Sequence, residues 1–267
     1  MKIQIKNEYD FHYEIIESVI VKYDQILKIN KYNMEVIIYL HIIDNKIFTE
    51  YIKSKYPNII FDKIDNYDYC INCTIYDHLY NMIDNDISNK KYISHEITDR
   101  LKTNPNVFFL TPLSGKNFIY MDILPYSDYK IKSNIPIYLI QGNIDSNRRY
   151  FNLLSKILEK TYKYDFKIKL IGRGNLPKEF LKYKSKILLK NNLNYIDYHK
   201  EFSDIYCILP LISKKTHPQY YTKKITSSIN YAKGYNLAVL IDKDLQNIYN
   251  LERVYIYNNI DDIDKIF

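Results

Sequence analysis

The chain has 267 residues, 46% of them hydrophobic, which suits one large or two small domains with real cores. Its net charge is +7, but the lysines are spread along the whole chain instead of forming one basic block. No zinc-finger spacing, nucleic-acid-binding signature or basic helix with interleaved aromatics accompanies this charge, so no nucleic acid partner is expected. The richness in Ile, Asn, Lys and Tyr is typical of very AT-rich genomes, as in some large DNA viruses.

No apolar run approaches the roughly 20 residues that cross a bilayer, and the N-terminus has no apolar signal region. We therefore expect no transmembrane segment and a cytoplasmic protein, in the host cytoplasm if it is viral. Three cysteines, Cys70, Cys73 and Cys207, are too few and too unevenly spaced for a disulfide framework. Cys70 and Cys73 lie three apart in a strand-like stretch and point to opposite faces, so we expect packing roles rather than a metal or redox pair.

The first half of the chain alternates helical and strand-like patterns, which favours a parallel α/β sheet. The pattern predicts a helix over 9–29, a strand over 34–43, a helix over 45–57, and strands over 58–64, 67–76, 90–97, 106–113 and 117–126. A polar stretch over 126–134 has no clear periodicity and is the expected linker. The predicted domains are therefore 1–130 and 131–267.

The second half repeats this alternation. The predicted elements are a strand over 135–141, a helix over 147–162 with Asp145 or Ser146 as N-cap, a strand ending at 172, helices over 176–186 and 195–205, a strand over 206–212, a helix over 222–233, strands over 237–241 and 254–258, and a closing acidic helix.

Four of the five glycines, Gly142, Gly172, Gly174 and Gly234, lie at the ends of apolar runs in this half. A glycine after a parallel strand lets the backbone turn tightly and approach a phosphate, and the next helix offers its free N–H groups to that anion. Arg149 follows Gly142 by seven residues, next to Arg148. Two guanidinium groups at such a place can grip phosphate oxygens, although a solvated arginine pair is the simpler interpretation.

The order of these elements over roughly 135 to 258 resembles the donor-binding domain of GT-B glycosyltransferases, particularly the family 4 type. The resemblance implies an α/β GT-B fold, with two Rossmann-like domains and a cleft between them. It also implies transfer of a sugar from a nucleotide-sugar donor to a glycan, protein or small-molecule acceptor, without a metal or other cofactor. The N-terminal domain would bind the acceptor and the C-terminal domain the donor.

The resemblance also implies which residues hold the donor. They are Gly142, Asn143, Arg148, Arg149, Gly172, Gly174, Lys223, Lys224, Thr226, Ser227 and Ser228. One departure matters: the family pattern has two glutamates eight residues apart, and Tyr221 and Ile229 occupy those positions here. This sequence therefore lacks the two carboxylates that the resemblance would assign to recognition of the ribose and of the donor sugar.

His95 and Glu96 end a predicted first-domain strand and are the candidate catalytic residues, because a histidine there can act as a base or hold sugar hydroxyls. Asp242 and Asp244 resemble a metal-binding Asp-x-Asp, but no metal is expected. Three alternatives to a glycosyltransferase remain open at this point. They are a catalytically degenerate GT-B relic with a binding or structural role, a basic nucleic-acid-associated protein, and a sugar-nucleotide epimerase.

Overall fold

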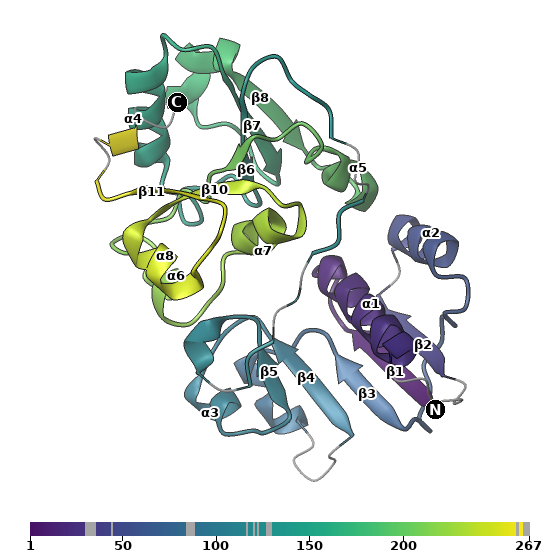
Figure 1. Ribbon diagram of the computed structural model, residues 1–267. Helices are drawn as coiled ribbons and strands as arrows, with labels where there is room; N and C mark the ends of the chain where they lie inside the picture. Colours follow the sequence, from purple (N-terminus) through teal and green to yellow (C-terminus); the bar gives the residue numbers. More distant parts are fainter. Residues whose placement is uncertain are drawn as a thin grey trace. The chain divides into compact units, whose positions relative to one another are not determined.

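The computed structural model describes residues 1–29, 36–43, 45–83, 89–115, 117–119, 121, 123–126, 130–259 and 262–263. The chain forms two compact units. Unit 1 comprises Met1–Leu124 and Lys223–Ile225, and unit 2 comprises Pro125–Thr222 and Thr226–Phe267. Each unit is built on its own parallel sheet (Figure 1). The closing acidic helix expected after 258 falls mostly outside the described residues.

The sheet of unit 1 has the strand order β2-β1-β3-β4-β5, and every neighbouring pair is parallel. Its strands are β1 (Lys2–Asn7), β2 (Ile37–Ile42), β3 (Tyr69–Asn72), β4 (Lys90–Ser94) and β5 (Val107–Phe109). The sequence pattern did not predict β1, although it lies inside the sheet. Its alternation of Ile with Lys and Gln is a short strand pattern, and Ile3, Gln4 and Ile5 are all buried.

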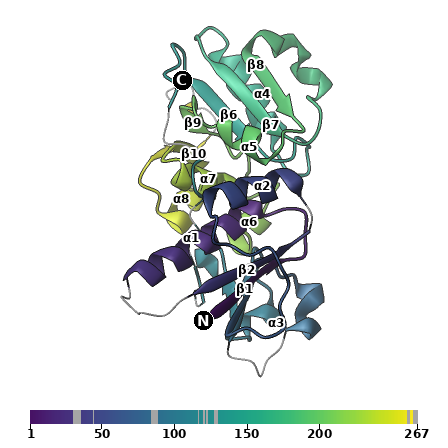
Figure 2. The same ribbon diagram turned by 90° about the vertical axis from the view of Figure 1, so that its right-hand side faces the viewer.

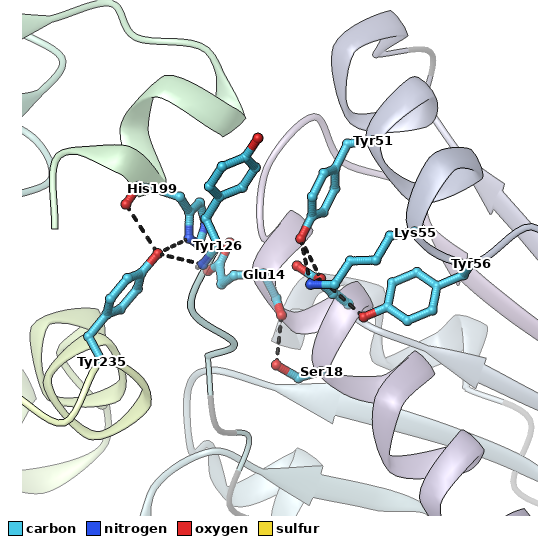
Figure 3. A network of polar contacts seen from close by, with 9 residues as sticks. Glu14, Ser18, Tyr51, Lys55, Tyr56, Tyr126, His199 and Tyr235 are labelled. Carbon is cyan, nitrogen blue, oxygen red and sulfur yellow. Dashed lines mark hydrogen bonds and ion pairs between the residues drawn. The ribbon is translucent and has the colours of Figure 1, made fainter. Parts of the chain in front are cut away.

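Two helices of unit 1, α1 (Tyr13–Ile29) and α2 (Lys46–Lys55), lie next to each other (Figure 2). The buried Glu17 carboxylate joins them, because it accepts hydrogen bonds from the Tyr51 hydroxyl at 2.7 Å and from Lys55 Nζ at 2.7 Å (Figure 3). The shorter elements are η1 (Asp77–Met82), α3 (Asp99–Lys102) and η2 (Pro112–Ser114).

Two strands predicted in unit 1 are wrong. In the described parts of 58–64 and 117–126, pairing is limited to single bridges, from Ile60 to Tyr39 and from Phe118 to Phe109. After Ile60 the chain leaves the sheet edge and crosses one face of the sheet. There the Gln4 side chain accepts from Ile64 N at 2.8 Å.

The sheet of unit 2 has the order β11-β10-β9-β6-β7-β8, again with all neighbours parallel. Its strands are β6 (Ile137–Gln141), β7 (Lys167–Gly172), β8 (Ile187–Asn191), β9 (Cys207–Ile208), β10 (Ala238–Asp242) and β11 (Val254–Tyr257). Of these, β8 was not expected from the sequence. It is an edge strand with exposed Leu188 and Leu189, so it lacks the continuous burial on which the prediction of strands relied.

The helices of unit 2 are α4 (Phe151–Thr161), η3 (Lys178–Lys186), α5 (Tyr195–Lys200), α6 (Gln219–Thr222), α7 (Ser227–Gly234) and α8 (Lys243–Tyr249). Five buried residues of α4 pack into the main core of this unit: Phe151, Leu153, Leu154, Ile157 and Leu158. The predicted N-cap at Asp145 or Ser146 is wrong. The Asp145 carbonyl instead accepts from Arg149 N in a turn before the helix, and Tyr150 is the N-cap.

Among the described residues, no helix is both long and apolar enough to span a membrane. The thiols of Cys70, Cys73 and Cys207 are free and buried, as expected for packing cysteines.

Candidate functional site

The loops after β6 and β7 touch each other through their backbones, and this contact explains the glycines. Gly142, Gly172 and Gly174 all have positive φ, at +97°, +149° and +120°. A Cβ on Gly172 would overlap the carbonyl oxygen of Gly142, and one on Gly174 would lie 2.6 Å from the carbonyl oxygen of Ile144. Both positions therefore need glycine for the loops to approach, whether or not a ligand is bound.

Arg149 is buried at the carboxyl end of β6, with 5% of its surface exposed. Its Nη2 donates to the Gln141 carbonyl, and its Nη1 donates to the Arg148 carbonyl at 2.9 Å. Its Nε is buried and has no hydrogen-bond partner in the described chain. Burial lowers the pKa of the guanidinium, and the Asp145 carboxylate acts in the opposite direction, although it forms no ion pair with Arg149 among the described residues. By contrast, Arg148 is exposed, so the two arginines do not act as a solvated pair.

The Gln141 side chain connects β6 to two helices of unit 2. Its Nε2 donates to Ser227 Oγ at 2.8 Å and to Ser228 Oγ at 3.1 Å, and its Oε1 accepts from the Tyr198 hydroxyl at 2.6 Å. The buried Gln141 thereby places the first turn of α7 beside the end of β6. The sequence analysis missed this residue; its signal was an amide at the last position of an apolar strand, directly before a glycine.

An aromatic cluster supports α5 and α7 behind this connection. The His199 side chain is 2% exposed, and its Nδ1 lies 2.6 Å from the Tyr235 hydroxyl (Figure 3). The Phe202 ring stacks on Tyr231 and Tyr235, with centroids 4.9 and 4.5 Å apart. These contacts hold the C-terminal half of α7. At the other end of the helix, Thr226 is the buried N-cap and Ser227 is exposed.

Most of the expected donor-binding residues of unit 2 thus gather where β6 and β7 end and α7 begins. Arg149, Ser227 and Ser228 are linked through Gln141, and Gly142 lies against the Arg149 guanidinium. Asn143 and Arg148 are exposed on the loop before α4. This is the edge at which open parallel α/β sheets bind their ligands.

The two expected donor lysines, Lys223 and Lys224, belong to unit 1. The helix predicted over 222–233 is split, because α6 ends at Thr222 and the next residues pair with the segment after β4. Ile97 N donates to the Lys223 carbonyl at 2.8 Å, and an antiparallel bridge joins Glu96 to Lys224. The Glu96 carboxylate forms ion pairs with Lys223 Nζ at 2.9 Å and Lys224 Nζ at 2.7 Å.

This double ion pair determines the charge state of Glu96. Partial burial raises the pKa of the carboxyl, but the hydrogen bonds from Lys224 and Lys223 outweigh it, and the net pKa lies below the ordinary value. Glu96 therefore stays ionised at neutral pH and is ion-paired with two lysines. A carboxylate in this state is poorly suited to general acid–base catalysis.

His95 stacks on a second histidine that the sequence analysis missed. The His95 and His12 rings are 3.6 Å apart at 14°, and His12 Nδ1 lies 3.2 Å from Thr74 Oγ1. These residues follow β4, β1 and β3, so they share the carboxyl edge of the unit 1 sheet. His95 Nε2 is buried without a hydrogen-bond partner in the described chain.

Burial keeps both imidazoles neutral. It lowers the pKa of His12 to about 4 and, together with His12 and Lys224, holds the pKa of His95 well below its ordinary value. A neutral imidazole can accept a proton or a hydrogen bond. The signal for His12 was weak in sequence: it is a lone histidine before a helix, in a backbone conformation with φ of +63°.

The two positions of the absent glutamates have structural roles. The buried Tyr221 donates its hydroxyl to the Asp242 carboxylate, which also caps α8 by accepting from Leu245 N at 2.9 Å. Ile229 is fully buried. Asp244 pairs with Lys214 at 2.9 Å. Among the described residues, no group of three or more His, Cys, Asp or Glu side chains could hold a metal ion.

No protein-family model matches the sequence, and no curated protein matches it. Several solved structures do match the fold. AviGT4, a glycosyltransferase involved in avilamycin A biosynthesis, has a TM-score of 0.62 at 10% identity, over 99% of this chain and 87% of that one. A glycosyltransferase from Rickettsia africae has a TM-score of 0.56 at 12% identity, over 99% and 86%.

UDP-GlcNAc 2-epimerase from Neisseria meningitidis, solved with UDP-GlcNAc bound, has a TM-score of 0.53 at 13% identity, over 100% of this chain and 90% of that one. At such identities the similarity establishes the fold and not the activity. The protein is an α/β protein with two parallel, Rossmann-like sheets that match GT-B structures.

Proposed function

We propose that unit 2 binds the diphosphate of a nucleotide-sugar donor and that the protein is a glycosyltransferase acting on a glycan, protein or small-molecule acceptor. The observation that carries this proposal is Arg149, a buried cation whose Nε has no hydrogen-bond partner in the described chain. Burying a charge without a directly ion-paired partner is costly, so such a group suits an anion that binds to it.

The surroundings of Arg149 suit a diphosphate. The first turn of α7 presents backbone N–H groups with the positive end of the helix dipole, and the Ser227 and Ser228 hydroxyls add donors. Gly142 makes room for the Arg149 guanidinium, because a Cβ at this position would lie 2.5 Å from Nη2. We assign Asn143, Arg148, Gly172, Gly174 and Thr226 to the rim of the same site.

Catalysis in this proposal rests on stabilising the charge that develops on the leaving diphosphate, which cations and helix N-termini do well. His95, neutral and with a free Nε2, is the group in unit 1 that would accept a proton or hold a sugar hydroxyl. His12 positions that ring by stacking on it. Glu96, Lys223 and Lys224 are assigned to holding their own segment in unit 1, because they neutralise one another.

Sugar-nucleotide epimerisation is the second candidate, favoured by the similarity of the whole chain to a UDP-GlcNAc 2-epimerase. A non-catalytic GT-B relic is the third, favoured by Tyr221 and Ile229 at the positions of the two family glutamates. The three candidates share a nucleotide site in unit 2 and differ in what happens to the bound sugar.

A thermal-shift screen against nucleoside diphosphates and nucleotide sugars tests the nucleotide site in unit 2, which all three candidates require. A ligand at 100 times its Kd stabilises the protein by about 2.7 kcal/mol, which corresponds to a rise in Tm of roughly 5 to 10 °C for a protein of this size. We expect nucleoside diphosphates to give such a shift and nucleosides without phosphate to give much less. If no nucleoside diphosphate shifts Tm at millimolar concentration, the proposed function is wrong.

A further inference from the structure

The buried amide of Gln141 donates to two hydroxyls of α7. Its Nε2 donates to Ser227 Oγ at 2.8 Å and to Ser228 Oγ at 3.1 Å, and its Oε1 accepts from the Tyr198 hydroxyl at 2.6 Å. A side-chain amide has two N–H donors, so both find an acceptor here. The direction of these bonds decides whether the serine hydroxyls offer a ligand a donor or an acceptor.

The opposite orientation of the amide would satisfy its hydrogen bonds less well. Turned over, the amide would accept from both serines through Oε1 and would donate to Tyr198 through Nε2. Tyr198 is the one partner of this end of the amide among the described residues, so one N–H group would lack an acceptor. Gln141 is 2% exposed, and a buried N–H group without an acceptor is costly.

The Arg149 guanidinium favours the same orientation. Burial lowers the pKa of Arg149, whereas Tyr220 and Tyr198 act in the opposite direction, so the Tyr198 hydroxyl lies within electrostatic reach of this cation. A nearby cation attracts the oxygen end of a hydroxyl dipole and turns its hydrogen away. The Tyr198 hydrogen then points to Gln141 Oε1, which leaves Nε2 to face the serines.

The Ser227 hydroxyl is therefore held as a donor toward a ligand. Its oxygen already accepts from Gln141, and its hydrogen has no acceptor among the described residues. Ser227 is exposed and Ser228 is fully buried, so a ligand meets Ser227 first. Thr226, the N-cap of α7, makes no side-chain bond to the first turn, and Arg149 adds a buried Nε without a partner in the described chain. This side of the site thus offers donors.

We propose that Gln141 is a positioning residue of the diphosphate site, which holds the Ser227 hydroxyl as a donor and so selects ligand groups that only accept hydrogen bonds. Ionised phosphate oxygens are such groups. A ligand group with N–H donors at the same place would meet other donors and would bind less well. This role rests on the proposed function, because it concerns the diphosphate that unit 2 is proposed to bind.

The test is a double-mutant cycle on the full chain, measured by calorimetric titration with inorganic pyrophosphate at low salt. Pyrophosphate carries the diphosphate without a base or a sugar. In the unaltered protein, Ser227→Ala should weaken pyrophosphate binding roughly tenfold or more, as expected for loss of a hydrogen bond to a charged group. In Gln141→Glu, the carboxylate only accepts and takes the Ser227 hydrogen, so Ser227→Ala should then weaken binding by less than about twofold.

The cycle separates positioning from packing. The added charge of Gln141→Glu repels pyrophosphate with or without the Ser227 hydroxyl, so this repulsion cancels when the two effects of Ser227→Ala are compared. If Ser227→Ala weakens binding equally in both backgrounds, or has no effect in the unaltered protein, Gln141 does not position this hydroxyl, while the proposed function stands. If neither pyrophosphate nor any nucleoside diphosphate binds the unaltered protein, the proposed function is wrong and this role with it. If only a nucleoside diphosphate binds, the same cycle is measured with the one that gives the largest thermal shift.

Tyr198→Phe is the second variant, for the case that Gln141→Glu does not fold. It removes the hydroxyl that fixes the amide, so Gln141 can turn over and accept from Ser227. We expect the effect of Ser227→Ala on binding to become at least about threefold smaller in this background. Tyr195→Phe, also on α5, is the matched control, because Tyr195 has no hydrogen bond to Gln141 among the described residues. Equal effects of Ser227→Ala in Tyr198→Phe, Tyr195→Phe and the unaltered protein would overturn the proposal.

Discussion

Replacing Arg149 with Met is the sharpest perturbation of the proposed donor site. Met keeps a long flexible stem and removes the guanidinium, so it isolates the charge and its hydrogen bonds. Two hydrogen bonds to backbone carbonyls are lost, at Gln141 and Arg148, and bonds to charged groups contribute about 1.5 to 3 kcal/mol each. In the opposite direction, the variant no longer buries a charge without a directly ion-paired partner, and that burial costs several kcal/mol in real proteins.

These two effects on folding nearly cancel, so we expect the free energy of unfolding to change by no more than about 1 to 2 kcal/mol. Ligand binding has no such compensation. Loss of one or two charge-assisted hydrogen bonds to phosphate oxygens should weaken nucleoside diphosphate binding by about 2 to 4 kcal/mol, or roughly 30- to 1,000-fold. Arg148→Met, at the exposed neighbour, should change stability by less than about 0.5 kcal/mol.

Calorimetric titration with a nucleoside diphosphate, alongside denaturant unfolding of the same samples, measures both quantities. We expect a large loss of affinity in Arg149→Met with near-normal stability. If this variant binds the diphosphate as tightly as the original protein, Arg149 does not hold the diphosphate. Severe destabilisation with retained affinity would show instead that the guanidinium is a structural group.

Three further predictions follow from the geometry. Gly172→Ala should lower the free energy of unfolding by more than about 2 kcal/mol, because its Cβ would overlap a backbone carbonyl. Gly115→Ala, at a position with φ +66° and open space, should lower it by only about 1 kcal/mol. Urea unfolding of the two variants measures this difference. His95→Gln should reduce turnover about 10²- to 10⁴-fold with nucleotide affinity unchanged, and equal turnover would remove it from the mechanism. Folding lowers the pKa of His12 from 6.5 to about 4, so the unfolded chain binds the proton at a higher pH than the folded chain does. The free energy of unfolding should therefore fall as the pH drops from about 6.5 to about 4. His12→Phe should reduce this dependence of stability on pH, and an unchanged acid transition would contradict the buried stack.

Much of the fold was predictable because parallel α/β architecture is encoded in local signals. Long apolar runs alternating with helical periodicity gave the parallel sheets, and glycines after strands located the loops that close on each other. What failed depended on tertiary contacts. β1 has a short alternating pattern that the prediction passed over, and its place between β2 and β3 is what buries Gln4 as well as Ile3 and Ile5. The predicted long helix 222–233 is interrupted because Lys223 and Lys224 find a carboxylate far away in sequence.

Part of the candidate site could likewise be predicted from the sequence, and part could not. Arg149 was identified from its spacing after Gly142, but its burial, which distinguishes it from Arg148, comes only from the packed loop. Gln141 and His12 could not be ranked from sequence, because each acquires its significance from partners on other elements. Spacing within one segment could be read from the sequence, whereas contacts between distant segments could not.

The central claim is that the protein transfers a sugar from a nucleotide-sugar donor. The most direct measurement is product analysis of each nucleotide sugar that binds, by following nucleoside diphosphate release and the identity of the sugar. The account predicts release of the nucleoside diphosphate, lost in Arg149→Met, with the sugar transferred to water or to an added acceptor. A bound donor recovered intact would contradict it in favour of a relic, and a donor recovered with one inverted sugar carbon would contradict it in favour of an epimerase.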